Sequence, residues 1–166
     1  MKYIQCPDSL TAGDLRNDCL FLAGGISGCG DWQTEMKNLL KSQKNLVVVN
    51  PRRINFDKTK ISDLEQISWE RIHLTNCNLI SFWFPEETVC PITLFDLGYC
   101  VSYQESHPWP LGGMKVFYGC HPNYSRISDV KTQILLSNKN SGQFGAMATS
   151  IEDLTNQVIS HINRER

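Results

Sequence analysis

The chain has 166 residues, of which 41% are hydrophobic and 20% are charged, and its formal net charge is −1. These values are typical of a soluble globular protein, so we expect residues 1–166 to form a single domain with a substantial core. The near-zero charge gives no electrostatic reason to bind polymeric nucleic acid, and no apolar run is long enough to predict a membrane span.

Seven cysteines, an odd number, occur without an apolar leader at the N-terminus. This pattern predicts free thiols in a reducing compartment and therefore a cytoplasmic protein. His73 and Cys77 are four residues apart, and Cys120 precedes His121, but two ligands are too few for structural zinc. We therefore predict no metal and no cofactor.

The first predicted elements are a strand at residues 19–23 and the helix that follows it. The strand is a continuous apolar run bounded by glycines, a pattern typical of strands buried on both faces. Asp31 is a suitable N-cap, and apolar residues recur at helical spacing from Trp32 onward. A second buried strand, residues 46–50, ends at Pro51, because proline cannot continue a central strand.

The middle of the chain repeats this order. Ser62 and Glu65 form a capping box for a second helix. The apolar residues expected on one face of that helix are Leu64, Ile67, Ile72 and Leu74. The third predicted strand, residues 79–84, is stopped by Pro85, and a helix with Pro91 near its first turn follows.

The last third of the chain is predicted to hold a strand at 114–118, a short helix at 129–136 and a further strand within 142–150. Ser150 caps a final amphipathic helix, and residues 104–113 and 137–141 have the composition of loops. Alternating strands and helices predict an α/β fold, with a mostly parallel sheet covered by helices on both faces.

Ligands of such sheets bind beyond the carboxyl ends of the strands, so the loops that follow the strands are the candidate site. The first loop contains Gly24, Gly25, Gly28 and Gly30. These glycines allow close approach of a ligand to the backbone, with amides for an anion or a sugar hydroxyl. The alternative is a tight turn that needs positive φ angles.

The second loop supplies Asn50, Arg52 and Arg53, and the guanidinium groups suit phosphate or carboxylate contacts. The alternative for both arginines is a solvated loop or an ion pair with a nearby acid. Trp69 and Glu70, on the second helix, pair a stacking surface with a carboxylate. The alternative for Trp69 is core packing, and the alternative for Glu70 is simple exposure to solvent.

Asp96 is the most unusual residue of the third loop and helix. It lies about one turn into a helix that should pack on the sheet, between Phe95 and Leu97. A carboxylate in an apolar setting near a helix N-terminus indicates function, although a helix-dipole partner on the solvent side is the alternative. Gly98 beside it allows close approach of a ligand or of backbone.

Five sequence blocks in order resemble the nucleoside 2-deoxyribosyltransferase-like family. They read FLAGGI…DWQ, NPRR, QISWE, FWFP-x-x-T-x-CPITL-x-x-LG and VFYGCHPNYSRISDV, and together they cover residues 19–136. The resemblance implies a flavodoxin-like or Rossmann-like three-layer sandwich with about five parallel strands. It also implies cleavage of an N-glycosidic bond and transfer of the deoxyribosyl group to another base.

The resemblance also implies roles for particular residues. The nucleophile of the family is a glutamate in an E-L-G motif, and Asp96 stands at that position here, with a side chain shorter by one methylene. Asn78 matches an aspartate that contacts the base. The resemblance assigns no acid to protonate the leaving base, and from the residues themselves we expect Glu70 or Glu87 to do so.

The predicted catalytic residues are Asp96, Glu70 and Glu87. The predicted substrate-binding residues are Gly24, Gly25, Ile26, Trp32, Asn50, Pro51, Arg52, Arg53, Trp69, Asn78, Phe82, Trp83, Phe84, Pro85 and Thr88. The partner is a small nucleoside or nucleotide, and the resemblance implies a homo-oligomer. Two other functions fit the same residues: a nucleotide-binding sensor or sequestering module without turnover, and a hydrolase of NAD-type nucleotide signals.

Overall fold

A single five-stranded parallel sheet forms the centre of the molecule. The structure, a computed structural model, describes residues 1–54, 61–107, 113–141 and 144–165. The strands are β1 (Lys2–Gln5), β2 (Asp18–Gly24), β3 (Leu46–Asn50), β4 (Leu79–Phe84) and β5 (Lys115–Cys120). Their order in the sheet is β1-β3-β2-β4-β5, and each neighbouring pair is parallel.

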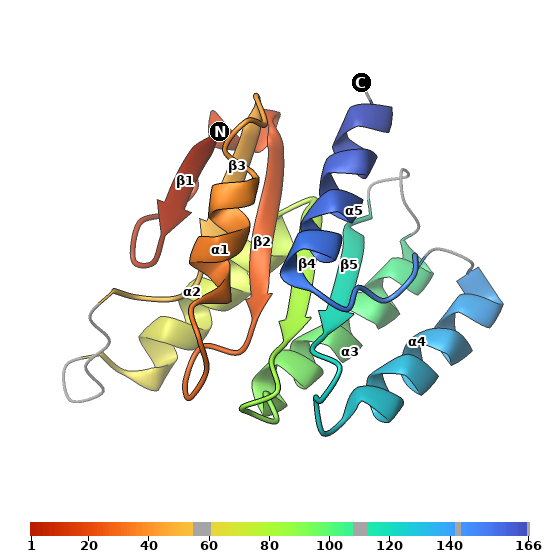
Figure 1. Cartoon of the computed structure of the whole chain (residues 1–166). Helices are drawn as coiled ribbons and strands as arrows, with labels where there is room; N and C mark the ends of the chain where they lie inside the picture. The colour runs from red at the N-terminus through yellow and green to blue at the C-terminus, as the bar shows by residue number, and fades with distance from the viewer. Residues whose placement is uncertain (55–60, 108–112, 142–143, 166) are drawn as a thin grey trace.

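Helices cover both faces of this sheet (Figure 1). They are α1 (Trp32–Leu39), α2 (Asp63–Asn76), α3 (Pro91–Ser106), α4 (Ile127–Ser141) and α5 (Ile151–Arg164), with a short 3-10 helix η1 (Asp14–Arg16) before β2. In Figure 1, α1 and α5 lie in front of the sheet, and α2 and α3 lie behind it. This arrangement confirms the predicted three-layer α/β fold with about five parallel strands.

Alternation of side chains along the strands builds two separate cores. Phe21 and Ala23 of β2 belong to the core that α2, α3 and α4 cover, whereas Leu20 and Leu22 belong to the core beneath α1 and α5. Because both faces of β2 are buried, its sequence is a continuous apolar run rather than an alternating one.

The predicted helix starts are confirmed by their caps. Asp31 accepts a hydrogen bond from the backbone N–H of Thr34 at 3.2 Å, and Ser62 accepts one from Glu65 at 3.1 Å. Pro91 is the first residue of α3, where its missing N–H costs nothing.

The position of the fifth strand was predicted wrongly. The strand that the sequence did not predict is β1, at the N-terminus. It pairs with β3, and Ile4 is its one buried residue. In the segment predicted instead, residues 142–143 lie outside the described residues, and the remainder forms a single bridge between Ala148 and Gly119. That bridge has two backbone hydrogen bonds, too few to extend as a strand.

Three details of the helices also differ from the prediction. On α2, Leu64, Ile67 and Ile72 are exposed, whereas Trp69 and His73 pack on the sheet with Leu74. Helix α3 continues to residue 106, and α4 starts at residue 127 and continues through 137–141, which were predicted as loop. Residues 108–112 of the other predicted loop lie outside the described part.

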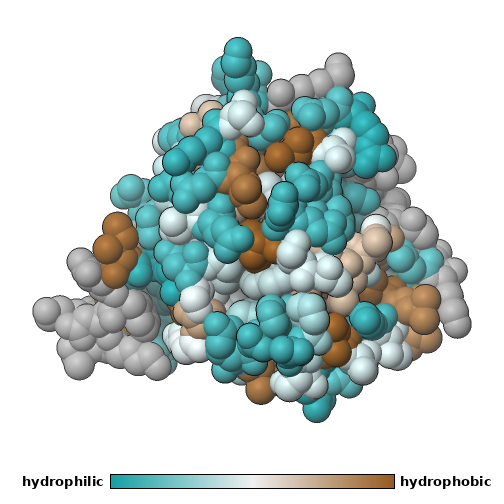
Figure 2. All heavy atoms as spheres, viewed as in Figure 1, coloured by the Kyte–Doolittle hydropathy of each residue, from teal (hydrophilic) through white to brown (hydrophobic). Residues whose placement is uncertain are grey.

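The surface formed by α1 and α5 is mostly hydrophilic, with a narrow hydrophobic band between the two helices (Figure 2). Both helices therefore turn their polar sides to solvent and their apolar sides to the sheet. Among the described residues, no helix combines the length and apolar character needed to cross a membrane.

Candidate active site

A cavity of about 420 Å³ opens beyond the carboxyl ends of the central strands. Its walls come from the glycine loop after β2, the loop after β3, one side of α2 and the first turns of α3. Strand β2 lies between β3 and β4. The connection from β2 to β3 therefore crosses the sheet in one direction, and the connection from β3 to β4 crosses it in the other. The place where the two directions part is the position where doubly wound sheets bind their ligands.

Asp96 projects into this cavity from α3 and is half-buried. Burial, together with the negative charge of Glu70, raises the pKa of Asp96 to about 6, and the positive charge of Arg71 acts in the opposite direction. The Arg71 guanidinium lies 3.8 Å from the centre of the Tyr99 ring, so its position is fixed by a cation–π contact. Asp96 is thus a carboxyl that gains and loses a proton near neutral pH.

Glu70 enters the same cavity from α2. Burial raises the pKa of Glu70, while a hydrogen bond from Gln66 and the charge of Arg53 act to lower it. The amide nitrogen of Gln66 lies 2.7 Å from Glu70 Oε1. Gln66 and Glu70 are four residues apart on the helix, which places them on one face.

The two arginines of the β3–α2 loop point in different directions. Arg53 lines the cavity, with Nη2 2.9 Å from a Glu65 carboxylate oxygen. Arg52 instead contacts the β2–α1 loop, where Nη2 donates to the Gly30 carbonyl at 2.9 Å and Nε lies 3.3 Å from Asp31. Only Arg53 is therefore placed to face a ligand in this cavity.

Glycine is required at the last residue of β2 and at the first residue of the loop that follows, because of close packing. A Cβ on Gly24 would lie 2.5 Å from the Trp32 ring, and one on Gly25 would lie 2.8 Å from Pro85. The Gly25 carbonyl also accepts a hydrogen bond from Trp32 Nε1 at 2.9 Å. The loop is thus held against the protein core while its other side faces the cavity.

Cys90 is the N-cap of α3 and lines the cavity with a left-handed backbone (φ 51°). Burial raises the pKa of the Cys90 thiol to about 11. A thiol that stays protonated at neutral pH is a poor nucleophile, which leaves the carboxyl groups as the reactive side chains of the cavity.

The structure brings eight of the predicted site residues together around the cavity. They are Gly24, Gly25, Ile26, Pro51, Arg53, Glu70, Thr88 and Asp96. The other predicted residues do not line it. They are Trp32, Asn50, Arg52, Trp69, Asn78, Phe82, Trp83, Phe84, Pro85 and Glu87.

Most residues of the second group have structural contacts that explain their positions. Trp69 is buried, stacks on His73 and donates to the Asp8 carbonyl at 3.0 Å. Asn50 is buried and donates to Tyr3 Oη at 2.6 Å.

The aromatic residues that end β4 belong to the cores. Phe82 and Phe84 are fully buried on one face of the sheet, and Trp83 is buried on the other. Pro85 is also buried and packs against the glycine loop. Glu87 is exposed in the loop that follows.

Asn78 lies at the amino ends of the strands, whereas the cavity lies beyond their carboxyl ends. It directly precedes β4, where its Oδ1 accepts a hydrogen bond from the Cys19 N–H at 2.7 Å and its Nδ2 donates to Asp18. Because the amino ends of parallel strands cannot meet a ligand at their carboxyl ends, Asn78 is not among the residues that we propose for base binding.

Several lining residues were not predicted from the sequence. They include Asp63, Gln66 and Ile67 on α2, and Ile92 and Thr93 at the start of α3. The spacing of Asp63, Gln66, Ile67 and Glu70 is that of one helical face, and this periodicity was the available signal. Within the described ranges, no group of three or more His, Cys, Asp or Glu side chains could hold a metal ion.

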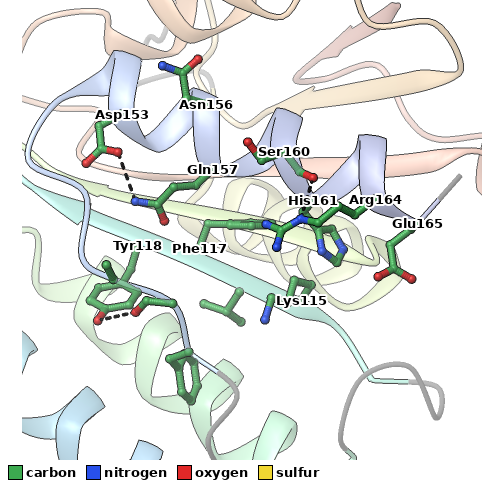
Figure 3. A pocket seen from close by; sticks show the side chains of 14 residues that line it. Lys115, Phe117, Tyr118, Asp153, Asn156, Gln157, Ser160, His161, Arg164 and Glu165 are labelled. Carbon is green, nitrogen blue, oxygen red and sulfur yellow. Dashed lines mark hydrogen bonds between the residues drawn. The ribbon is translucent and has the colours of Figure 1, made fainter.

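A second cavity, of about 680 Å³, lies between β5 and α5 (Figure 3). Lys115, His161, Arg164 and Glu165 gather at one end of it, and Asp153 and Gln157 at the other. It runs alongside the edge strand rather than across the strand ends, and it contains none of the residues predicted for the site. The cavity around Asp96 is therefore the candidate active site.

Comparison with protein families gives a match. A family model described as nucleoside 2-deoxyribosyltransferase like matches residues 18–107, which run from the start of β2 to just beyond the end of α3. These residues include every segment that lines the cavity. A comparison with curated proteins gives no match.

Proposed function

Because this chain belongs to the nucleoside 2-deoxyribosyltransferase-like family, we propose that it cleaves the N-glycosidic bond of a deoxynucleoside and transfers the deoxyribosyl group to another base or to water. The observation that carries this proposal is the pair of carboxyl groups, Asp96 and Glu70, which two helices bring into one cavity. Two carboxyl groups that differ in environment are what a retaining glycosyl reaction requires.

In the first step, an oxygen of Asp96 attacks the anomeric carbon and forms a glycosyl ester. The bond between that carbon and the base nitrogen breaks, and Glu70 gives its proton to the departing base. In the second step, an incoming base or a water molecule attacks the same carbon and releases Asp96, while Glu70 accepts the proton of the nucleophile.

The ionisation of the two groups supports these roles. A carboxyl with a pKa of about 6, as burial gives Asp96, is mostly ionised at neutral pH and can act as a nucleophile. Burial raises the pKa of Glu70, which helps it to retain the proton that a general acid needs. Glu87 is exposed and outside the cavity, so Glu70 is the better candidate for this role.

The charges around the cavity favour a nucleoside over a nucleotide as substrate. Among the described lining residues, Asp63, Glu70 and Asp96 are acidic, and the one cation, Arg53, already contacts Glu65. A 5′-phosphate would add roughly two negative charges beside three carboxyl groups. A neutral deoxynucleoside avoids this repulsion.

We also propose that the protein is a cytoplasmic homo-oligomer. Large apolar side chains are exposed on α2 and α3, including Leu64, Ile67, Ile92 and Phe95, and two of them, Ile67 and Ile92, line the cavity. Exposed apolar side chains beside a binding site are a feature of protein interfaces. All seven cysteines are free thiols, which fits a reducing compartment.

The test is to incubate the protein with a panel of deoxynucleosides, deoxynucleotides and NAD, with and without a free acceptor base, and to measure released base by chromatography. We expect release from deoxynucleosides and its loss in Asp96→Ala. Asp129→Ala is the matched control, because Asp129 is an exposed aspartate on α4 outside the cavity. Equal release by Asp96→Ala and the wild type would show that Asp96 is not the nucleophile.

A nucleotide-binding module without turnover is the second candidate, and the shorter side chain of Asp96 favours it. Lengthening that side chain separates the two functions. If reach limits the reaction, Asp96→Glu should release base faster than the wild type, since a misplacement of about 1 Å can cost roughly 100-fold in rate. Binding of a nucleoside without release by either protein would support the binding module.

A further inference from the structure

Gln66 lies between Arg53 and Glu70 and uses every polar group of its side-chain amide. Its Nε2 donates to Glu70 Oε1 at 2.7 Å and to the Pro51 carbonyl at 3.1 Å. Its Oε1 accepts from Arg53 Nε at 2.6 Å and faces the Cys6 thiol at 3.6 Å. One residue thus connects the loop after β1, the loop after β3 and a carboxyl group of the cavity.

These partners fix the orientation of the amide. Arginine can only donate hydrogen bonds, and a carbonyl can only accept them. Turning the amide by half a rotation would place its NH₂ group against Arg53 Nε–H and its oxygen against the Pro51 carbonyl. The amide must therefore present its N–H to Glu70, which favours the ionised form of that carboxyl.

Among the described residues, none donates a comparable hydrogen bond to Asp96. Its surroundings within the described residues are the apolar wall of the cavity, the negative Glu70 and the positive Arg71. When the two carboxyl groups of the cavity hold one proton between them, the hydrogen bond from Gln66 to Glu70 therefore favours Asp96 as the group that carries it.

We infer that Gln66 is a positioning residue that decides which of the two carboxyl groups, Asp96 or Glu70, holds the shared proton. Its catalytic meaning rests on the proposed function, in which Asp96 attacks in its ionised form and Glu70 supplies the proton to the base. The shared proton must therefore pass from Asp96 to Glu70 before Asp96 can attack a sugar. Gln66 thereby sets the lower end of the pH range in which the enzyme works.

The other groups that face Glu70 must be kept constant in a test of this idea. Arg53 approaches from the loop after β3, the Cys6 thiol from the loop after β1 and Asp96 from α3, while Asp63 lines the same cavity on α2. The substitution Gln66→Met leaves all of these groups in place and removes only the amide, with little change in side-chain length.

The experiment follows the side-chain carboxyl carbons of the protein by NMR during a pH titration without substrate. The variants Glu70→Gln and Asp96→Asn assign the two signals, and Gln43→Met, in the turn after α1, is the matched control. In Gln66→Met we expect the proton affinity of Glu70 to rise by roughly tenfold and that of Asp96 to fall. Unchanged midpoints for both groups would overturn the inference.

The pH profile of base release gives a second readout that loss of packing alone would not change. Its acidic limb should move to lower pH in Gln66→Met, because Asp96 then ionises more easily. If Gln66→Met does not fold, Gln66→Leu removes the same amide with a different side-chain shape, leaves Arg53, Cys6 and Asp63 in place, and should also raise the proton affinity of Glu70. If wild-type protein releases no base, the proposed function fails, while the titration still decides the role of Gln66.

Discussion

Replacing Asp96 with asparagine should make the protein more stable at neutral pH. Asp96 is a carboxyl in a partly buried site with one negative neighbour, so its ionised form is less stable in the folded protein than in the unfolded chain. Asparagine has nearly the same shape and carries no charge, and it removes this penalty.

The size of the gain follows from the pKa. Burial raises the pKa of Asp96 from its usual value of 3.8 to about 6, and a difference of about two pH units corresponds to about 3 kcal/mol. Asp96 is only half-buried, so solvent screens part of this energy. We therefore expect Asp96→Asn to raise the free energy of unfolding by about 1–2 kcal/mol.

The pH dependence of this gain has a defined sign. Above a pKa of about 6, Asp96 is ionised in both states and the penalty is fully present. As the pH falls from there towards the usual value of 3.8, the folded protein takes up the proton first and the penalty disappears. The stabilisation by asparagine should therefore be largest near neutral pH and almost vanish at about pH 4.

Urea denaturation of both proteins at about pH 8 and about pH 4 measures this difference. Asp63→Asn is the control, because Asp63 is an exposed carboxylate in the first turn of α2, where a negative charge is favourable. That variant should be slightly less stable than the wild type. A destabilising effect of Asp96→Asn at both pH values would refute the idea that the fold holds this carboxylate at a cost.

Three further predictions concern the same cavity. Glu70→Gln should lower the rate of base release by roughly 100-fold and move the acidic limb of the residual rate to lower pH, because the neighbouring charge raises the pKa of Asp96; a limb that stays in place would contradict this coupling. Gly25→Ala should destabilise the protein by about 1–3 kcal/mol in urea denaturation, whereas Gly30→Ala, whose Cβ would meet nothing within 4 Å, should have little effect. Gly98→Ala should raise the stability by about 1 kcal/mol in thermal unfolding, since its Cβ also meets open space on an exposed helix surface, and a large loss would reveal a contact there.

The sequence predicts the central strands well and the edge strand poorly, for a physical reason. Strands β2, β3 and β4 are buried on both faces, so each is a run of apolar residues that stands out from its surroundings. Strand β1 has four residues and buries only Ile4. Its stability comes from pairing with β3, which no local pattern reveals.

The orientation of side chains on α2 was harder to predict than the helix itself. The spacing of Leu64 and Ile67 predicted that they face the core, but both are exposed. Trp69 and His73 pack against the core instead, and the His73 imidazole hydrogen-bonds to the Trp69 carbonyl. A buried polar residue with a local backbone partner cannot be distinguished from a surface residue by hydropathy alone. The same uncertainty hid Gln66, because three of its four partners, Cys6, Pro51 and Arg53, lie in the loops after β1 and β3.

The meeting of Asp96 and Glu70 can be explained by the topology of the sheet. The connection from β2 to β3 crosses the sheet in one direction, and those from β3 to β4 and from β4 to β5 cross it in the other. Because parallel crossovers are right-handed, α1 must lie on one face, and α2 and α3 must lie together on the opposite face. Helix α2 then passes behind β2, so its carboxylate and the one on α3 face the same space above the glycine loop. The carboxyl pair is therefore a consequence of strand order, and Gln66 is the local feature that makes its two members unequal.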